Sequence, residues 1–324
     1  MGEAFISKRR HIGLKVESAK GTYLAPASAD YALLAYDIQA TTQFGRFDRD
    51  TQKAYLTKLP GLVGTTACQI SFSVEVRHTA NTTTADVWET ALLGCGFTFA
   101  SSTYKPSSNA ADHKTLSIAV ALGSFGTSAS ECVIFKAKGC AGTVTFEGKV
   151  GQPLIARFTF TGVFEEVADG TLEVPTQEVG IPSIFQGVSA TWGGSSSRVI
   201  STINVDLGNS IVLRESVNST SGLLHAVITD RRPTGSIDPD LELVATEDFY
   251  GSLRNNDPKS LTFAVTTVVP SSSNRTQTFT LANVRVTNVN DANRNGIQVA
   301  GIDFEIVDTS DTTTPDGDIT IAIS

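Results

Sequence analysis

The 324-residue sequence has few of the residues that build metal, disulfide and catalytic sites. It contains four cysteines, four histidines, two tryptophans and one methionine. The cysteines, Cys68, Cys95, Cys132 and Cys140, all lie in the first half, and none forms the Cys-x-x-Cys spacing of a zinc site. We therefore expect reduced, mostly buried thiols in a protein made in the cytoplasm, and neither a metal nor another cofactor.

Long apolar runs and an excess of basic charge are also absent. The longest apolar stretches, such as residues 116–122, are far shorter than the ~20 residues of a membrane helix. The basic cluster at residues 8–10 is not followed by the apolar region of a secretory signal. The 25 Lys and Arg against 33 Asp and Glu give a formal net charge of −8, which argues against a surface that grips nucleic acid through clustered basic side chains.

The charge is divided unevenly along the chain. Residues 1–170 carry 16 basic and 15 acidic side chains, a net charge of +1, whereas residues 171–324 carry 9 and 18, a net charge of −9. The excess is sharpest in residues 302–318, where Asp303, Glu305, Asp308, Asp311, Asp316 and Asp318 have no basic companion. Such a run fits a solvated acidic edge, and the alternative is a surface that repels a negatively charged molecule.

Apolar and polar residues alternate over many short segments, which predicts β-strands with one buried face. These segments are residues 68–76, 115–121, 132–138, 143–146, 155–164, 200–205, 210–214, 261–269, 277–286 and 301–307. Only two segments have helical spacing: residues 84–93, with Thr84 as a possible N-cap, and residues 245–254, with Thr246 in that position. The pattern predicts a mainly-β protein with antiparallel sheets in a barrel or sandwich.

The order of these elements occurs twice. Residues 114–120 and 259–265 share four identical positions at an offset of 145, which also pairs Gly151 with Gly296. Strand 68–76 and its helix match strand 223–229 and its helix. We predict two tandem antiparallel β-barrel or sandwich domains, each flanked by a short helix: residues 1–170, with an N-terminal arm, and residues 171–324, with the acidic C-terminal segment.

Enzymatic and metal sites find little support in the motifs. The histidines are scattered, no Gly-x-Ser-x-Gly nucleophile motif occurs, and we predict that the protein is not an enzyme. Residues 291–296 have the oxygen donors and glycine that open a calcium loop, but Ile302 stands where a bidentate glutamate belongs. We therefore interpret this segment as a polar β-turn.

Two segments resemble a known family. One is the stretch Arg232-Pro-Thr-Gly-Ser-Ile-Asp-Pro239, which follows strand 223–229. The other is Gly13-Leu-Lys-Val-Glu-Ser-Ala-Lys-Gly-Thr22 near the amino end. Both resemble the tail tube (major tail) proteins of tailed bacteriophages, although the first copy has residues 76–81 where the second has its Pro-Thr-Gly-Ser loop.

The resemblance implies a structural virion protein of the phage tail, assembled in the host bacterial cytoplasm. Tail tube proteins join their sheets into rings of six domains, and the rings stack into a hollow conduit for DNA delivery. Two domains per chain would make the ring a homotrimer with pseudo-six-fold symmetry, whereas six chains are needed if the second half is a decoration domain. The resemblance also implies partners in the tape measure, tail terminator and distal tail proteins, and DNA that passes through the lumen without specific binding.

Eight residues are candidates for these roles. Asp303 and Glu305 alternate with apolar neighbours on a predicted strand, which places both on one face. By the resemblance we expect this face to line the lumen, and the alternative is that it lies on the outside of the tube. The resemblance implies inter-ring contacts by the amino-terminal arm, by the long loop of residues 44–62 and by residues 231–240. The candidates for these contacts are Arg46, Arg49, Arg231, Arg232, Thr234 and Asp238.

Other functions are compatible with the same composition. Another phage structural protein, such as a capsid decoration protein or a baseplate or minor tail component, would share the β-rich, Ser/Thr-rich sequence. A carbohydrate-binding β-sandwich would need exposed aromatic rings, and Trp88 and Trp192 are the only tryptophans.

Overall fold

The computed structural model describes residues 5–80, 82–83, 85–124, 132–177, 180–196, 198–270, 272–308 and 316–324. Strands make up 57% of the structure and helices 5%, and the strand pairs are antiparallel. The mainly-β prediction is therefore confirmed. Of the two architectures expected, the sandwich fits, because the sheet does not close into a barrel.

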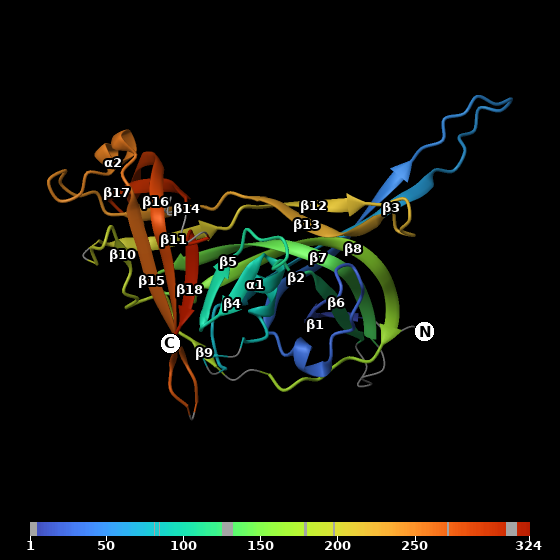
Figure 1. The fold of residues 1–324 in the computed structure, drawn as a ribbon, viewed down its shortest axis with the longest axis horizontal. Coiled ribbons are helices and arrows are strands. Elements are labelled where there is room, and N and C mark those ends of the chain that lie inside the picture. Colours follow the sequence, from blue (N-terminus) through green and yellow to red (C-terminus); the bar gives the residue numbers. More distant parts are fainter. Residues whose placement is uncertain are drawn as a thin grey trace.

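The first half of the chain forms one run of strands in the order β1-β6-β7-β8-β3-β2 (Figure 1). Its long strands β7 and β8 form a hairpin, and β2 and β3 form another. The elements are β1 (Phe5–Val16), the 3-10 helix η1 (Ser28–Tyr31), β2 (Ala35–Phe47), β3 (Leu62–Glu75), α1 (Thr90–Gly94), β4 (Phe97–Ala100), β5 (Thr103–Pro106), β6 (Leu116–Ser124), β7 (Cys132–Lys149) and β8 (Ile155–Gly170).

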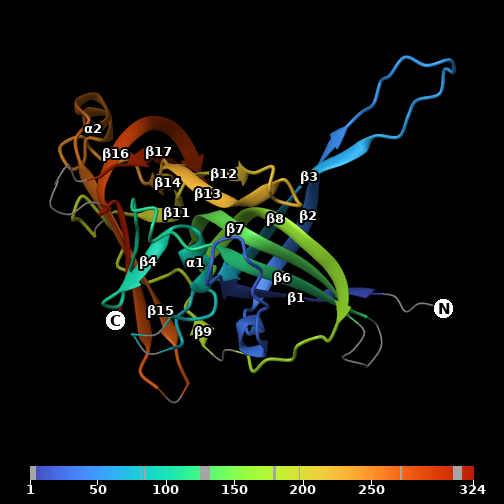
Figure 2. The same ribbon diagram turned by 45° about the vertical axis from the view of Figure 1, so that its right-hand side comes forward.

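The second half repeats this order as β9/β10-β15-β16-β17-β14-β11. A separate hairpin, β12-β13, extends beyond β11 and β14 and lies across β7 and β8 (Figure 2). The elements are β9 (Ile181–Pro182), β10 (Thr191–Trp192), β11 (Ile200–Asp206), β12 (Asn209–Glu215), β13 (Leu223–Arg231), β14 (Thr234–Pro239), α2 (Phe249–Asn255), β15 (Lys259–Val268), β16 (Arg275–Arg294), β17 (Ile297–Ile306) and β18 (Ile319–Ile323).

Corresponding strands also share their irregularities. β2 has a register shift between Tyr36 and Gln39, and β11 has one between Ile200 and Ile203. The counterpart of β3 is β14, since β14 pairs with β17 as β3 pairs with β8. The sequence match of residues 68–76 with 223–229 was wrong, because the latter form β13, whose described ladder runs to β12 alone.

The two halves are joined by strand pairing and by a shared hydrophobic core. The edge of β11 pairs with β7, and β18, near the carboxyl end, pairs with β5 of the first half. One hydrophobic core runs through both halves, and Phe146 and Phe279 meet in it with ring centroids 5.1 Å apart. The division at residue 170 stays a prediction, because a shared sheet and core do not separate two folding units.

Both helices are shorter than expected. α1 begins only at Thr90, and the expected cap Thr84 lies outside the described residues. α2 is capped by Asp248, whose carboxylate accepts a hydrogen bond from the backbone N–H of Gly251. The prediction of Thr246 as the cap was therefore wrong.

The segment with the composition of a half calcium loop is a hairpin turn. β16 and β17 pair up to Arg294 and Ile297, which leaves a two-residue connection. Asn295 and Gly296 both have positive φ, +53° and +89°, as a type I′ turn requires. The polar turn predicted from the sequence is confirmed.

The cysteines are buried and free, as predicted. Burial raises the pKa of the Cys68 thiol to about 12, so this group stays protonated at neutral pH. Within the described ranges, no helix combines the length and the apolar character of a membrane span.

Candidate functional site: a polar sheet face, an acidic cavity and a buried cluster

One face of the main sheet is polar across both halves of the chain. Eight successive strands carry it, in the order β2-β3-β8-β7-β11-β14-β17-β16. On β17, Ile302 and Phe304 are buried while Asp303 and Glu305 are exposed, so the predicted alternation is present. The strand register places Glu305 in one cross-strand row and Asp303 in the next. The first row is Ser73, Arg157, Thr145, Asp206, Thr234, Glu305 and Arg285, and the second is Glu147, Asn204, Ser236, Asp303 and Asn288.

Carboxylates outnumber guanidinium groups in these two rows. The acidic members are Glu147, Asp206, Asp303 and Glu305, and the basic members are Arg157 and Arg285. The Nε of Arg157 lies 2.8 Å from a carboxylate oxygen of Glu147, which offsets one acidic charge. Sequence reasoning found only the β17 residues, because alternation along a strand does not say which strands lie beside it.

The predicted contact residues at the end of β13 are engaged within the chain. The guanidinium of Arg231 lies 3.1 Å from Asp318 and 3.2 Å from Asp316. Arg232 forms an ion pair of 2.8 Å with Asp230, and its own side chain is 83% exposed. Of the two arginines, Arg232 is therefore the one that is open to a partner.

Thr234 and Asp238 lie on a strand, so the extended loop expected over residues 231–240 was wrong in this part. β14 is paired on both sides, with β11 and with β17. The carboxylate of Asp238 accepts hydrogen bonds from the backbone N–H groups of Ser201 and Thr202 and forms an ion pair of 3.1 Å with Arg294. Burial opposes ionisation of Asp238, but the hydrogen bonds from Ser201 and Thr202 outweigh it and hold its pKa below the usual value.

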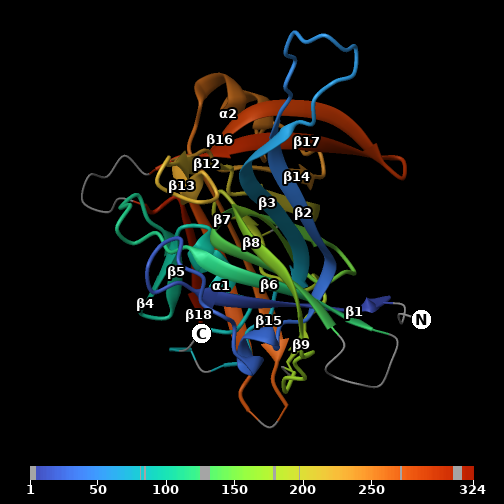
Figure 3. The ribbon, with the colours of Figure 1, turned by 90° about the vertical axis from the view of Figure 1, so that its right-hand side faces the viewer.

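Arg46 and Arg49 lie on a hairpin that projects from the body of the molecule (Figure 1, Figure 3). We call residues 43–66, which comprise the end of β2, the connecting loop and the start of β3, the arm. Four of its large apolar side chains are strongly exposed: Phe47 (67%), Tyr55 (78%), Leu56 (107%) and Val63 (68%). Exposed apolar residues gathered on one projection are typical of a surface that binds a partner.

A cavity of about 700 Å³ lies beside the end of β17. Its wall includes both ends of the β13–β14 junction and the C-terminal residues that pair with Arg231. We call it the acidic cavity, since five carboxylates line it against two guanidinium groups. The charged lining residues are Asp230, Arg231, Arg232, Glu305, Asp308, Asp316 and Asp318.

The surroundings shift the pKa values of two carboxylates of the acidic cavity in opposite directions. Burial raises the pKa of Asp318, and the charge of Arg231 only partly offsets this. Burial also opposes ionisation of Asp316, but hydrogen bonds from Ser108 and Arg231 hold its pKa below the usual value. Asp311, the remaining acidic residue of the C-terminal run, lies outside the described residues.

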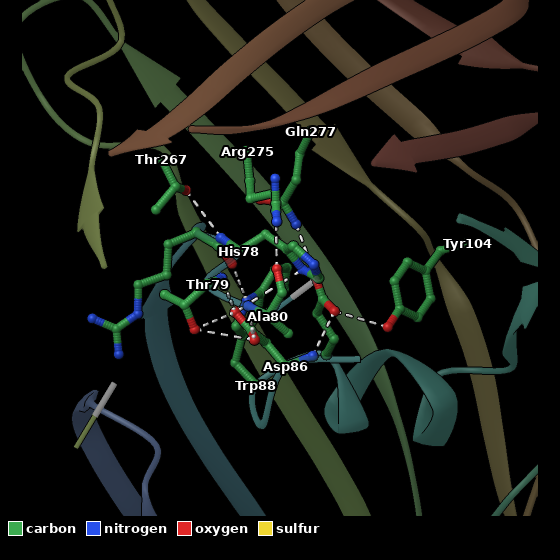
Figure 4. Close-up of polar contacts among 11 residues, drawn as sticks. His78, Thr79, Ala80, Asp86, Trp88, Tyr104, Thr267, Arg275 and Gln277 are labelled. Atoms are coloured by element: carbon green, nitrogen blue, oxygen red, sulfur yellow. Dashed lines mark hydrogen bonds and ion pairs between the residues drawn. The ribbon is translucent and has the colours of Figure 1, made fainter. Parts of the chain in front are cut away.

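A buried polar cluster lies where the two halves meet (Figure 4). Its centre is the fully buried carboxylate of Glu89, which accepts hydrogen bonds from Tyr104 at 2.8 Å and from Gln277 at 2.9 Å. The same carboxylate contacts Nδ1 of His78 at 2.8 Å, and the backbone N–H of His78 donates to Thr267. Gln277 and Thr267 come from the second half, so the cluster ties β15 and β16 to the first half.

This cluster contains the residue types of an acid-base site, but it is closed to solvent. The side chains of His78 and Glu89 are 0% exposed, and burial followed by the charge of Glu89 raises the pKa of the Tyr104 hydroxyl. A carboxylate that accepts from several donors satisfies a charge that would otherwise be costly to bury. The geometry supports a structural role. In the part of the chain that the structure describes, no group of three or more metal-ligating side chains is found.

A comparison with curated proteins finds no match to the chain. A comparison with protein families does: the model of the phage tail tube protein family matches residues 7–323, nearly the whole chain. The match covers both halves of the polar face, the arm and the acidic cavity. The chain therefore belongs to the phage tail tube protein family.

Proposed function

We propose that the protein is the major tail tube subunit, and that three copies form a ring which stacks with others into the hollow conduit for phage DNA. The observation that carries the proposal is the repeated strand order within one continuous sheet. Membership of the family supports a structural role in the virion tail. Each half then supplies one of the six domains of a ring.

The open sheet supports ring closure. The eight-strand polar path ends at β2 on one side and at β16 on the other. Unpaired strand edges promote association, and closed cyclic assemblies remove them. Three copies of this path would make a barrel of about 24 strands, above the 16 to 18 at which barrels already enclose an aqueous channel.

The polar face is the surface that we assign to the lumen. Asp303 and Glu305 would then face the bore together with Glu147 and Asp206 of neighbouring strands. An excess of carboxylates repels phosphate, and without clustered Lys and Arg there is little counterion release to hold DNA. DNA would pass through hydrated space without specific binding.

Assembly with itself and with other tail proteins follows from the family. We propose that the rings form in the host bacterial cytoplasm, and that the tube contacts the tape measure, tail terminator and distal tail proteins. Arg232 is exposed and remains a candidate for contacts between stacked rings.

Electron microscopy of the purified full-length protein tests the proposal. We expect long hollow tubes with evenly spaced rings, and averaged end views with three-fold symmetry. Protein that stays monomeric at high concentration and in the presence of tail extract would contradict the tube assignment. Six chains per ring would retain the tube and contradict the two-domain division.

A further inference from the structure

A buried carboxylate lies directly after β1. It belongs to Glu17, which is only 8% exposed and stands within the stretch of residues 13–22 that resembles the family. A carboxylate that is removed from water needs hydrogen-bond donors to offset its lost hydration. The donors of Glu17 therefore show which parts of the chain it holds in place.

Each oxygen of Glu17 accepts one hydrogen bond from a glycine N–H and one from a hydroxyl group. Oε2 accepts from the backbone N–H of Gly21 and from the hydroxyl of Thr115, both at 2.6 Å. Oε1 accepts from the backbone N–H of Gly139 at 2.7 Å and from the hydroxyl of Ser117 at 3.0 Å. The carboxylate thus bridges two glycines from distant parts of the chain.

Both glycines have backbone conformations that other residues rarely adopt. The φ angle is +81° at Gly21, in the turn after β1, and +58° at Gly139, within β7. The ladders of β7 with β6 and with β8 both shift register around Gly139, as they do at a β-bulge. Glu17 therefore holds a turn and a bulge against each other.

The backbone of β13 lies directly on these two glycines. A Cβ atom placed on Gly21 would be 2.5 Å from the carbonyl oxygen of Leu224, and one placed on Gly139 would be 2.8 Å from Cβ of His225. Neither position has room for a side chain. We call Gly21 and Gly139 the glycine seat of the β12-β13 hairpin.

His225 is not a counter-ion of Glu17. Burial, followed by the charges of Arg214 and Lys20, lowers the pKa of His225, and the opposing effect of Glu17 is smaller. The imidazole is therefore neutral at pH 7. Glu17 supports the hairpin through the two backbone N–H groups rather than through an ion pair.

The hairpin covers an apolar part of the polar face. Along β8, every second residue from Arg157 to Val163 lies on this face. Val163 is fully buried, and it belongs to a small apolar cluster with Ala67 of β3 and two residues of the hairpin, Leu213 and Leu223. Without the hairpin, the apolar side chains of the sheet would be open to solvent at this point.

The hairpin depends on the first half for its stability. It is a separate two-stranded sheet, and an isolated two-stranded hairpin is marginally stable at best. At its base, the side-chain amide of Asn209 donates to the carbonyls of Cys95 and Gly142. At its tip, the carbonyl of Ser221 accepts from the backbone N–H of Thr66. The glycine seat supports the tip end, which is the end far from β11 and β14.

We propose that Glu17 is a positioning residue for the β12-β13 hairpin. By fixing the two glycines, its carboxylate keeps the hairpin on the sheet, and loss of a glycine contact lets the hairpin open as a local unit while the sheet beneath it stays folded. An open hairpin exposes apolar side chains and two unpaired strand edges, which promote association with other copies. This role belongs to the single chain and holds whether or not the proposed ring forms.

Hydrogen exchange in the free full-length subunit tests the role of the carboxylate. Glu17→Gln keeps the size of the side chain, but the amide nitrogen cannot accept, so only one glycine N–H keeps its acceptor. Exchange in residues 209–231 should become about tenfold faster, whereas exchange in β3 and β8 should not change. Thr115→Val is the matched control, because it removes a hydroxyl donor from the same carboxylate and leaves both glycine contacts. It should leave exchange in the hairpin unaltered.

Two glycine variants test the seat independently of Glu17. Gly21→Ala and Gly151→Ala introduce the same backbone strain, since the φ angles are +81° and +82°. The new Cβ atom meets Leu224 at the first site, whereas at Gly151 it has no neighbour within 4 Å. Only Gly21→Ala should therefore accelerate exchange in the hairpin, again by about tenfold.

Unchanged exchange in the hairpin of Glu17→Gln would overturn the proposal. Equal acceleration throughout the chain would overturn it as well, because a general loss of stability produces that result. The same holds if Thr115→Val opens the hairpin as much as Glu17→Gln does. If Glu17→Gln does not fold, the glycine pair decides, and equal hairpin exchange in Gly21→Ala and Gly151→Ala overturns the proposal.

Discussion

The two halves of the chain share a strand order but differ in what lies against the end of their long hairpin. In the first half, β11 pairs with the end of β7, and the β12-β13 hairpin lies above it. In the second half, the end of β16 pairs with β17 alone among the described strands, and the acidic cavity lies beside the end of β17. Chain connectivity therefore closes one junction between the two halves, and in the proposed ring the corresponding junction is made with a neighbouring copy.

The halves also differ in net charge. Residues 1–170 have a net charge of +1 and residues 171–324 a net charge of −9. A duplicated chain that used both halves identically would gain nothing from this asymmetry. In the proposed ring of three chains, near-neutral and acidic halves would alternate around the circumference.

The strongest test of whether the halves are one unit comes from corresponding core residues. Phe160→Ala and Phe304→Ala each remove a ring that is no more than 1% exposed, and each should lower the free energy of unfolding by about 3–5 kcal/mol. Because the core is shared, both should shift a single transition in calorimetry. Two transitions, each moved by one variant alone, would establish independently folding halves. Phe47→Ala, on the exposed arm, is the control and should leave the free energy of unfolding of the monomer unchanged.

The buried cluster tests how tightly the halves are held together. Glu89→Ala leaves the Tyr104 hydroxyl and the Gln277 amide without their acceptor and should cost about 3 kcal/mol, since unsatisfied buried polar groups are expensive. Urea unfolding measures the change. Glu166→Ala, which removes a partly exposed ion pair with Lys136, is the matched control and should cost less than about 1 kcal/mol. Equal losses of unfolding free energy in the two variants would show that the buried cluster stabilises the contact between the halves no more than a surface ion pair does.

Charge reversal tests whether the basic side chains of the arm take part in assembly. Arg46→Glu with Arg49→Glu should raise the protein concentration needed for assembly by about tenfold, which corresponds to about 1.4 kcal/mol. Sedimentation velocity measures it, and the melting temperature of the free subunit should not change. Lys105→Glu, at an exposed site on β5 away from the arm, should assemble normally. Assembly of the arm variant at the unaltered concentration would remove the arm from the interface.

The smallest expected change in stability is that of a variant at Asp238, which links β14 to β11. Its pKa is lowered in the folded state, so its stabilising contribution is present above the ordinary carboxyl pKa of about 4 and is lost as pH falls through the depressed folded value. Asp238→Asn should therefore be less stable than the unmodified protein at pH 7, and the difference in stability should shrink as pH falls below about 4. A difference that persists unchanged at pH 2 would mean that the carboxylate's charge is not the cause.

Local patterns predicted the strands well, since alternation such as that of Ile302, Asp303 and Phe304 depends only on neighbours along the chain. The Asn295-Gly296 turn was predictable for the same reason, because its φ angles are a property of two residues. The helix cap was missed because Thr246 and Asp248 both fit the composition of an N-cap, and only tertiary packing decides where the first turn starts.

The assembly surfaces were less predictable because they depend on which distant segments lie side by side. The segment 223–229 has the alternation of β3, yet β14 takes that place in the sheet. Arg231 was expected at a free loop, but the C-terminal residues Asp316 and Asp318 return to pair with it. The rows of the polar face join Thr145 to Asp206 across the halves, a contact that no local pattern contains.

A reconstruction of assembled tubes by cryo-electron microscopy tests the proposed ring. We expect rings of three chains in which β2 of each chain continues the sheet of the next at β16, with Asp303 and Glu305 on the inner wall. Rings of six chains, or a polar face turned to the outside of the tube, would contradict it.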